Sequence, residues 1–248
     1  MSAKTDNPID PIHQFEIVKL IDFKLSNVDL SFTNSSLFMV ISILLVSSFF
    51  ILSTSRRSII PNKAQLIAEM CYEFIAGMID NHIGSKGKVF FPFVFTLFMF
   101  ILLCNFIGLV PYSFTVTSHI IVTFSFAGFI FLGVTLLGFI RHGVKFLRLF
   151  CPQGIPIFLA PLLVPIELIS YLSRPVSLSV RLAANMIAGH SMMKIFAGFV
   201  VVLGIYGVAP LVFVILLYAL ETIIAFLQAY VFAVLTCLYI SDSYNLHH

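Results

Sequence analysis

Long uncharged apolar runs alternate with short charged connectors along this chain. Residues 37–54 form an apolar run of 18 residues without a charge, which is enough for one helix across a hydrocarbon core about 30 Å thick. Residues 89–140 contain no Asp, Glu, Lys or Arg over 52 positions, and at 1.5 Å per residue they would make about 78 Å of helix. That length predicts two spans, with a hairpin turn near residues 111–118, where Pro111 starts a polar run.

The segment 62–82 has a different pattern. Its apolar residues Ile67, Met70, Phe74 and Met78 recur at helical spacing, and its charged residues lie off that stripe. The pattern predicts an amphipathic helix on the membrane surface. A polar connector with incidental apolar residues is the alternative interpretation.

The last third of the chain is apolar over two unusually long stretches. After a proline-rich segment, the pattern predicts helices over about 166–203 and about 210–240, separated by Gly204, Gly207 and Pro210. Each helix is longer than a core of about 30 Å requires. We therefore expect both helices to be strongly tilted or to lie near the membrane plane.

Composition agrees with this pattern. The chain is 60% apolar and 10% charged, and its mean hydropathy is +1.07, whereas a soluble domain carries roughly 25% charged residues. This excludes a soluble enzyme with an ordinary polar surface, and the net charge of +3 is too small to suggest nucleic-acid binding. We expect an all-α integral membrane protein with about five membrane helices plus one amphipathic surface helix, in a single membrane domain over 1–248.

The cysteines and the N-terminal segment carry little chemistry. The four cysteines stand singly, without a C-x-x-C pair or a nearby His at metal spacing, so we interpret them as apolar fillers. Residues 1–36 lack the basic start and short apolar core of a cleavable signal, so the first span is expected to direct membrane targeting. The cysteines are Cys71, Cys104, Cys151 and Cys237.

Positive charge predicts the orientation of the chain. Lys and Arg gather in two connectors, and the long run between them has none. Because cytoplasmic loops are enriched in these residues, both connectors should face the cytoplasm or its equivalent, and residues 1–36 and the turn near Pro111 should lie outside. The first connector holds Arg56, Arg57, Lys63, Lys86 and Lys88, and the second holds Arg141, Lys145 and Arg148.

Charged residues also occur inside the two last helices. A charge in lipid costs several kcal/mol, so such residues normally face a water-filled cavity or a partner and mark an ion pathway. In the second helix Glu221 is the single acid or base before Asp242. For Arg174 and Lys194, nearer the helix ends, a role in a pathway and a snorkelling surface charge are both open. The first helix carries Glu167, Arg174, Arg181, His190 and Lys194.

A helical projection separates these groups. His190 lies about 180° around the helix from Arg181 and about 13.5 Å further along, so one helix serves two polar environments. Glu221 and Gln228 are seven residues apart and share a face of the second helix. A polar seam within about 80° of the first helix contains Glu167, Ser170, Arg174, Ser177, Arg181 and Asn185.

Two sequence motifs carry a specific likeness. The runs SRPVSLSVRLAANMIAGH at 173–190 and ETIIAFLQAYVF at 221–232 resemble the membrane subunit a of F-type ATP synthases. The likeness extends over nearly the whole chain, including PIHQFE at 11–16 and NFIGLVP at 105–111. In detail it is similar to alphaproteobacterial and mitochondrial members.

This resemblance implies a proton-translocating stator subunit with two offset half-channels beside a rotating c-ring. Arg181 matches the essential arginine of the family, whose permanent charge attracts the ionised ring carboxylate and blocks a direct proton leak. The resemblance further implies peripheral-stalk b subunits as partners, no cofactor, no bond chemistry in this chain, and a bacterial inner membrane, or a mitochondrial one if the source is an organelle. It assigns Asn185, His190, Glu221 and Gln228 to the outer side, and Glu167, Ser170 and Ser177 to the inner side.

One pair departs from the well-studied bacterial members. They have a carboxylate where this chain has His190 and a histidine where it has Glu221, and mitochondrial-type members show the same exchange. We predict that the two side chains meet across the two helices and relay a proton. His119 and Asn105 are candidates for the outer mouth of the path, and a purely structural role is equally open for each.

Two other classes of membrane protein compete with this interpretation. A b-type haem-binding electron-transfer subunit would need paired histidines on facing helices, for which His119 and His190 are the candidates. A secondary transporter would use the buried Arg and Glu residues for its substrate, but the sequence shows no repeated halves.

Overall fold

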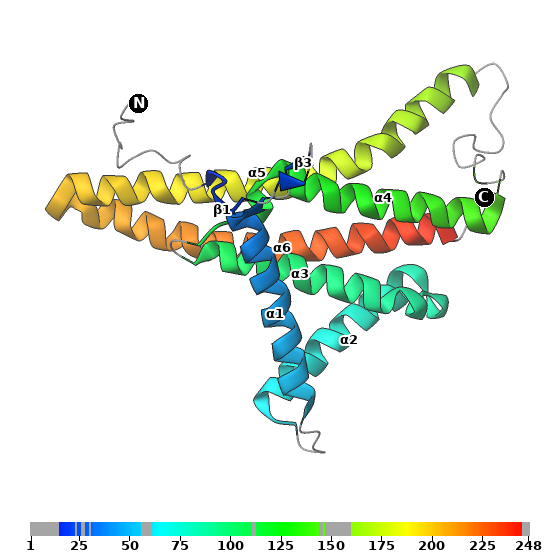
Figure 1. Cartoon of the computed structure of the whole chain (residues 1–248), viewed down its shortest axis with the longest axis horizontal. Helices are drawn as coiled ribbons and strands as arrows, with labels where there is room; N and C mark the ends of the chain where they lie inside the picture. Colours follow the sequence, from blue (N-terminus) through cyan, green and yellow to red (C-terminus); the bar gives the residue numbers. More distant parts are fainter. Residues whose placement is uncertain are drawn as a thin grey trace. The chain divides into compact units, whose positions relative to one another are not determined.

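The computed structural model describes residues 15–22, 24–25, 28–29, 31–55, 61–110, 113–143, 146 and 160–244. Its helices are α1 (Asn34–Ser55), α2 (Lys63–Ile83), α3 (Phe91–Leu109), α4 (Ile120–His142), α5 (Ala160–Leu203) and α6 (Val208–Tyr244) (Figure 1). Short 3-10 segments are η2 (Ser85–Phe90), η3 (Val116–Ser118) and η5 (Gly204–Gly207). Several predicted features lie outside the described residues, namely Pro11 to Gln14, Arg56, Arg57, Pro111, Lys145, Arg148 and Cys151.

The membrane fold class is confirmed. In the described part of the chain, four continuous helical stretches are long and apolar enough to cross a membrane: Asn34–Ser55, Gly87–Leu109, Ile120–His142 and Leu162–Tyr244. The fourth stretch contains both α5 and α6, so the described apolar helices are α1, α3, α4, α5 and α6. The chain is therefore an all-α multi-pass membrane protein.

The long final stretch is divided by glycines. Gly204 has a φ of 54°, in the left-handed region that glycine adopts without strain at the end of a helix. At Gly207 a Cβ would lie 2.5 Å from the carbonyl oxygen of Val200, so the chain can turn this tightly because no side chain is present. α6 then begins with Pro210 in its first turn, where a missing N–H costs no hydrogen bond.

α5 begins at Ala160, where the sequence predicted a start near residue 166. The proline-rich segment was interpreted as a connector, yet its last proline, Pro165, lies inside the helix, as does Pro175 within the predicted range. Proline is tolerated in membrane helices because nearby groups can satisfy the freed carbonyls. The proline-based boundary was therefore wrong.

The chain groups into two compact units, and α1, α3, α5 and α6 contribute residues to both. The first unit comprises Met1–Leu52, Met99–His119 and Leu182–Ala229. The second unit comprises Ser53–Phe98, Ile120–Arg181 and Tyr230–His248.

In the first unit, Asn34 ties the N-terminal segment to the start of α1. Its Oδ1 accepts from the backbone N–H of Ser35 (2.9 Å) and from that of Val18 (3.3 Å), and its Nδ2 donates to the carbonyl of Glu16 (3.1 Å). The strands β1 (Lys19–Ile21) and β4 (Phe32–Thr33) pair antiparallel, as do β2 (Lys24–Leu25) and β3 (Val28–Asp29). These strands are too short for an alternating pattern to reveal, and the sequence did not predict them.

The apolar core of the first unit joins three helices. Leu109 of α3, Met186 of α5 and Ala225 of α6 form a buried cluster, with Phe106 packed against it. Ala225 is fully buried, so α6 approaches its neighbours closely at that turn. In Figure 1 the part of α5 after Leu182 and the part of α6 before Ala229 run side by side.

In the second unit, the C-terminal part of α6 packs against α4. The Ser243 hydroxyl donates to the carbonyl of Val134 (2.9 Å), and His142 Nε2 donates to the carbonyl of Tyr244 (3.3 Å). At Gly138 of α4, a Cβ would lie 2.7 Å from the Ser243 hydroxyl oxygen. This glycine therefore sets how closely the two helices approach.

The segment predicted as an amphipathic helix is helical, but a different face is buried. Of the predicted stripe, Met78 is buried, whereas Ile67, Met70 and Phe74 are 52%, 60% and 41% exposed. The buried face of α2 holds Ala68, Ile75, Met78, Ile79 and Ile83. Because both faces are apolar, the pattern could not tell which one packs against protein.

Candidate functional site

A buried ion pair joins α5 and α6 in the first unit. His190 is 8% exposed and Glu221 is 4% exposed, and His190 Nδ1 lies 2.5 Å from Glu221 Oε1. The two residues are 31 positions apart in sequence. Their predicted meeting across the two helices is confirmed.

Gly189 makes this contact possible. A Cβ at Gly189 would lie 2.5 Å from Glu221 Oε1 and 2.7 Å from its carboxyl carbon. Real Cβ atoms do not come so close to other heavy atoms, so any other residue would displace the carboxylate. The run A-G-H at 188–190 therefore provides both the room and the partner for Glu221.

The second nitrogen of His190 is engaged by the end of α3. His190 Nε2 lies 2.8 Å from the carbonyl oxygen of Gly108. α3 ends at Leu109, so this carbonyl is among the last four of the helix, which have no N–H partner four residues later. The hydroxyl of Thr115 also donates to it (3.5 Å), whereas that of Ser113 has closer acceptors in the carbonyls of Ile107 and Val110.

Sequence reasoning did not identify Gly108. A glycine shortly before a proline signals the end of a helix, and this signal is present in NFIGLVP. It does not show which side chain satisfies the free carbonyls. A Cβ at Gly108 would also lie 2.8 Å from Cγ2 of Thr115, so the chain after α3 folds closely back on the helix end.

Asn105 lies one turn before Gly108 on α3 and is fully buried. Its Nδ2 donates to the carbonyl of Ala225 on α6 (3.1 Å). Among the described residues, Asn105 Oδ1 and Glu221 Oε2 are buried acceptors without a hydrogen-bond partner. Such acceptors are suited to bind a water molecule or a proton.

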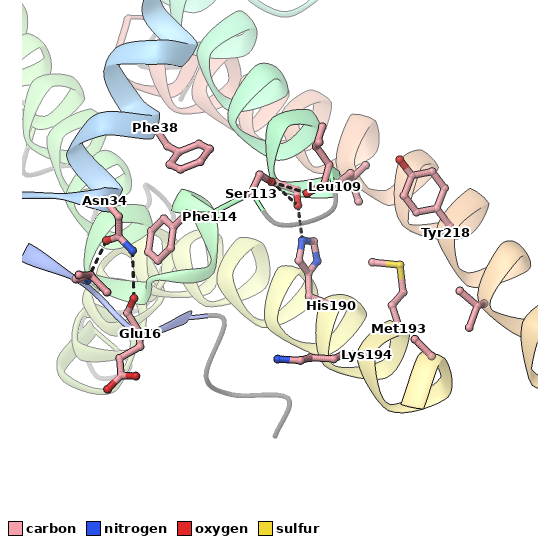
Figure 2. A pocket seen from close by; sticks show the side chains of 15 residues that line it. Glu16, Asn34, Phe38, Leu109, Ser113, Phe114, His190, Met193, Lys194 and Tyr218 are labelled. Carbon is pink, nitrogen blue, oxygen red and sulfur yellow. Dashed lines mark hydrogen bonds between the residues drawn. The ribbon is translucent and has the colours of Figure 1, made fainter. Parts of the chain in front are cut away.

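His190 lines a cavity of about 780 Å³ in the first unit (Figure 2). Residues from the N-terminal segment, α1, the end of α3, α5 and α6 line it. Lys194, one turn after His190, also lines the cavity, which favours a role in a pathway over snorkelling for this lysine. The other polar residues of the wall are Glu16, Asn34, Ser113 and Tyr218.

The remaining predicted site residues are spread along α5 and α6. Arg181 has an exposed side chain, as do Ser170 and Ser177, whereas Glu167 is half-buried. In the first unit, Asn185 and Gln228 are half-buried. An exposed arginine on an apolar membrane helix calls for a polar or charged partner.

Arg174 has partners of its own in the second unit. Its Nη1 lies 3.2 Å from Asp242 Oδ2, and its guanidinium lies 5.5 Å and 5.3 Å from the ring centroids of Tyr171 and Tyr239. The hydroxyl of Tyr171 lies 2.8 Å from that of Thr135. Sequence reasoning named Arg174 but not Tyr171.

His119 follows η3 and stacks on Phe114, with ring centroids 5.1 Å apart and an interplanar angle of 18°. Burial lowers the pKa of the His119 imidazole below its ordinary value of 6.5. The histidine is half-buried and lies outside the apolar spans. It is therefore neutral at physiological pH.

Metal binding finds no support in the described residues, where no group of three or more His, Cys, Asp and Glu side chains could hold an ion. Both ring nitrogens of His190 form hydrogen bonds to protein atoms. An axial haem ligand needs a free nitrogen lone pair, so this arrangement disfavours the haem interpretation.

Comparison with known proteins agrees with the geometry. The family model described as ATP synthase A chain matches residues 36–241. "ATP synthase subunit a" of Pelagibacter ubique is 56% identical over 241 residues, covering 96% of this chain and 99% of that protein. The proteins of the same name from Mesorhizobium japonicum and Rhodospirillum rubrum are 53% and 52% identical, over 97% and 96% of this chain and 98% and 99% of theirs. The chain therefore belongs to the ATP synthase A chain family.

Proposed function

We propose that this chain is the proton-translocating stator subunit of an F-type ATP synthase, with two offset half-channels that meet a rotating c-ring. The buried His190–Glu221 pair carries this proposal, because His190 also lines a cavity into whose largely apolar wall Glu16, Asn34 and Lys194 bring polar side chains. Burying a titratable group in a membrane protein costs several kcal/mol, so such groups normally mark ion or proton pathways. The family membership supports the same function.

The outer half-channel uses the cavity of the first unit. Protons enter between Glu16 and Lys194 and reach His190, which lines the cavity, and its partner Glu221 behind it. Asn105, which lies beside α6 through its bond to Ala225, adds a buried acceptor. The path continues past Asn185 and Gln228, and His119 stands near its mouth.

The inner half-channel uses the polar seam of α5 before Arg181. Glu167, Ser170 and Ser177 lie on that seam. Arg181 faces the ring carboxylate and separates the two half-channels, because a guanidinium stays charged at any relevant pH. One charge moving down 100 mV releases about 2.3 kcal/mol, so a rotor must gather several protons for each ATP.

The partners follow from this role. The c-ring packs against Arg181, peripheral-stalk b subunits hold the chain against the ring, and the complex lies in the bacterial inner membrane or its mitochondrial counterpart. Residues 1–36 lie on the outer side, and α2 lies on the opposite surface with Ile67, Met70 and Phe74 toward lipid. The exposure of these three side chains supports that position.

The alternative functions are weaker. The family comparisons favour neither a haem-binding subunit nor a secondary transporter. The engaged nitrogens of His190 disfavour axial ligation.

The test is ATP-driven acidification of inverted membrane vesicles at matched amounts of assembled complex. Arg181→Ala should abolish pumping, and Arg181→Lys should fail as well, because a desolvated lysine can lose its charge. Lys63→Ala, at an exposed position at the start of α2, is the control and should pump normally. Native pumping by Arg181→Ala would overturn the proposed function, and native pumping by Arg181→Lys would overturn the requirement for a permanent charge.

A further inference from the structure

We propose that Glu221 alone passes protons at the buried pair. His190 is a positioning residue, because its second nitrogen donates to the carbonyl of Gly108 and cannot pass a proton onward. The inference rests on the proposed function, because it concerns the outer half-channel. It replaces the expectation of a relay through the imidazole ring.

A histidine relay needs two usable nitrogens. The ring takes up a proton at one nitrogen and releases a different proton from the other. In this chain Nε2 lies 2.8 Å from the Gly108 carbonyl oxygen, which can only accept. Nε2 must therefore carry a hydrogen, and an amide carbonyl is too weak a base to take it onward.

The end of α3 holds the Gly108 carbonyl in this position. The Thr115 hydroxyl donates to it (3.5 Å), and the Ser113 hydroxyl donates to the nearby carbonyl of Val110 (2.7 Å). The carbonyl lies in the last turn of α3, so it has no competing partner inside the helix. The imidazole is thus fixed with its hydrogen on Nε2 and its Nδ1 toward Glu221.

The bond between Nδ1 and Glu221 Oε1 must then hold one proton. With Nε2–H fixed, a neutral ring has a lone pair on Nδ1, and at 2.5 Å two facing lone pairs would repel strongly. A proton on either atom removes this repulsion, as imidazole with carboxylic acid or as imidazolium with carboxylate. Both forms leave the pair with no net charge, as its burial favours.

Glu221 Oε2 is the remaining place for a transported proton. It is buried and has no hydrogen-bond partner among the described residues. With the shared proton on Nδ1 the pair is imidazolium and carboxylate, and an arriving proton forms an O–H bond at Oε2 while the imidazolium keeps both of its hydrogens, so the pair gains one positive charge and only Glu221 changes its protonation. Breaking that same O–H bond toward the next acceptor returns the pair to its neutral state, and no other bond is made or broken.

Glutamine at position 190 separates positioning from relay. Its amide can donate to the Gly108 carbonyl and accept from Glu221 whenever Glu221 is protonated, and because the amide cannot titrate, Glu221 then cycles by itself between carboxylate and carboxylic acid. Leucine fills a similar volume and can do neither. We expect ATP-driven acidification by His190→Gln to stay within about threefold of native, and by His190→Leu to fall about tenfold or more through two lost hydrogen bonds. Glu221→Gln should lower it by about a hundredfold.

Rates are normalised to the amount of assembled complex, with Arg181→Ala measured beside them. His190→Gln as slow as His190→Leu would overturn the inference, since the imidazole would then have to titrate. Native rates in His190→Leu or Glu221→Gln would overturn it as well. Native pumping in Arg181→Ala would instead reject the proposed function, whatever the result at position 190.

A second measurement does not depend on the pumping rate of any variant. Nitrogen-15 spectra of the assembled complex with labelled histidine, assigned by difference from His190→Gln, report each ring nitrogen directly. We expect Nε2 of His190 to stay protonated across the working pH range and Nδ1 to show a shared proton. Loss of the hydrogen from Nε2 at any working pH would contradict the inference.

Discussion

Gly189 and Glu221 lie so close that a Cβ at Gly189 would stand 2.5 Å from Glu221 Oε1. Gly189→Ala should push the carboxylate away from His190 and lower ATP-driven acidification by about tenfold or more, since a displacement of about 1 Å can cost that much. Alanine otherwise favours a helix over glycine by about 1 kcal/mol, so the loss would not reflect weaker helix formation. Gly128→Ala on α4 is the control, because a Cβ there meets no described atom within 4 Å. Equal rates in the two variants would contradict the prediction.

A second glycine comparison tests packing in the second unit. At Gly138 a Cβ would overlap the ring of Phe146 and lie 2.7 Å from the Ser243 hydroxyl, whereas at Gly133 on the same helix it meets no described atom within 4 Å. Gly138→Ala should therefore destabilise the packing of α4 on α6 by about 1–3 kcal/mol. Thermal dissociation of the purified complex measures this. Gly133→Ala should leave the midpoint unchanged or raise it, and the reverse order would show that the close approach is wrong.

Asn105 tests how α3 is joined to α6. Asn105→Leu removes the hydrogen bond from Nδ2 to the carbonyl of Ala225. Ala225 itself remains within α6. We expect a loss of about 1 kcal/mol in stability, measured as a lower midpoint of thermal dissociation. An unchanged midpoint would mean that the hydrogen bond contributes nothing and that the burial of Asn105 needs another explanation.

His119 predicts a dependence of stability on pH. Burial lowers the pKa of this histidine below 6.5 in the folded chain. As the pH falls below about 6.5, the ordinary pKa of histidine in the unfolded chain, the unfolded chain binds a proton that the folded chain does not. Stability is therefore lost below about pH 6.5 and unaffected above it. His119→Phe, which keeps a ring against Phe114, should show a smaller fall in dissociation temperature between about pH 7.5 and about pH 5.5. A fall as large as in the native chain would contradict the role of His119.

Much of the architecture could be predicted from the hydropathy pattern. The bilayer fixes the length of an apolar run, so α1, α3 and α4 appear as uncharged stretches in the sequence. The start of α5 was mistaken because proline breaks helices in water more strictly than in a membrane protein. The strands near Asn34 were missed because runs of two or three residues carry no periodicity.

For α2 the hydropathy pattern gave the helix but not its packing. Ile67 and Ile75 are equally apolar, yet the first is 52% exposed and the second is fully buried. Hydropathy measures the preference of a side chain for an apolar environment, and lipid and protein interior satisfy that preference alike.

The sequence by itself determined that this chain crosses a membrane several times and carries Arg181, His190 and Glu221 where charge is costly, because length, periodicity and the price of desolvation are local properties of the chain. The tertiary structure decided that His190 meets Glu221, 31 positions away, and the carbonyl of Gly108, 82 positions away. Hydrogen bonds between distant segments depend on how the helices pack, and a helix end offers its free carbonyls without specifying the donor. The hydrogen bond from His190 Nε2 to the Gly108 carbonyl therefore follows only from the packing of α3 against α5.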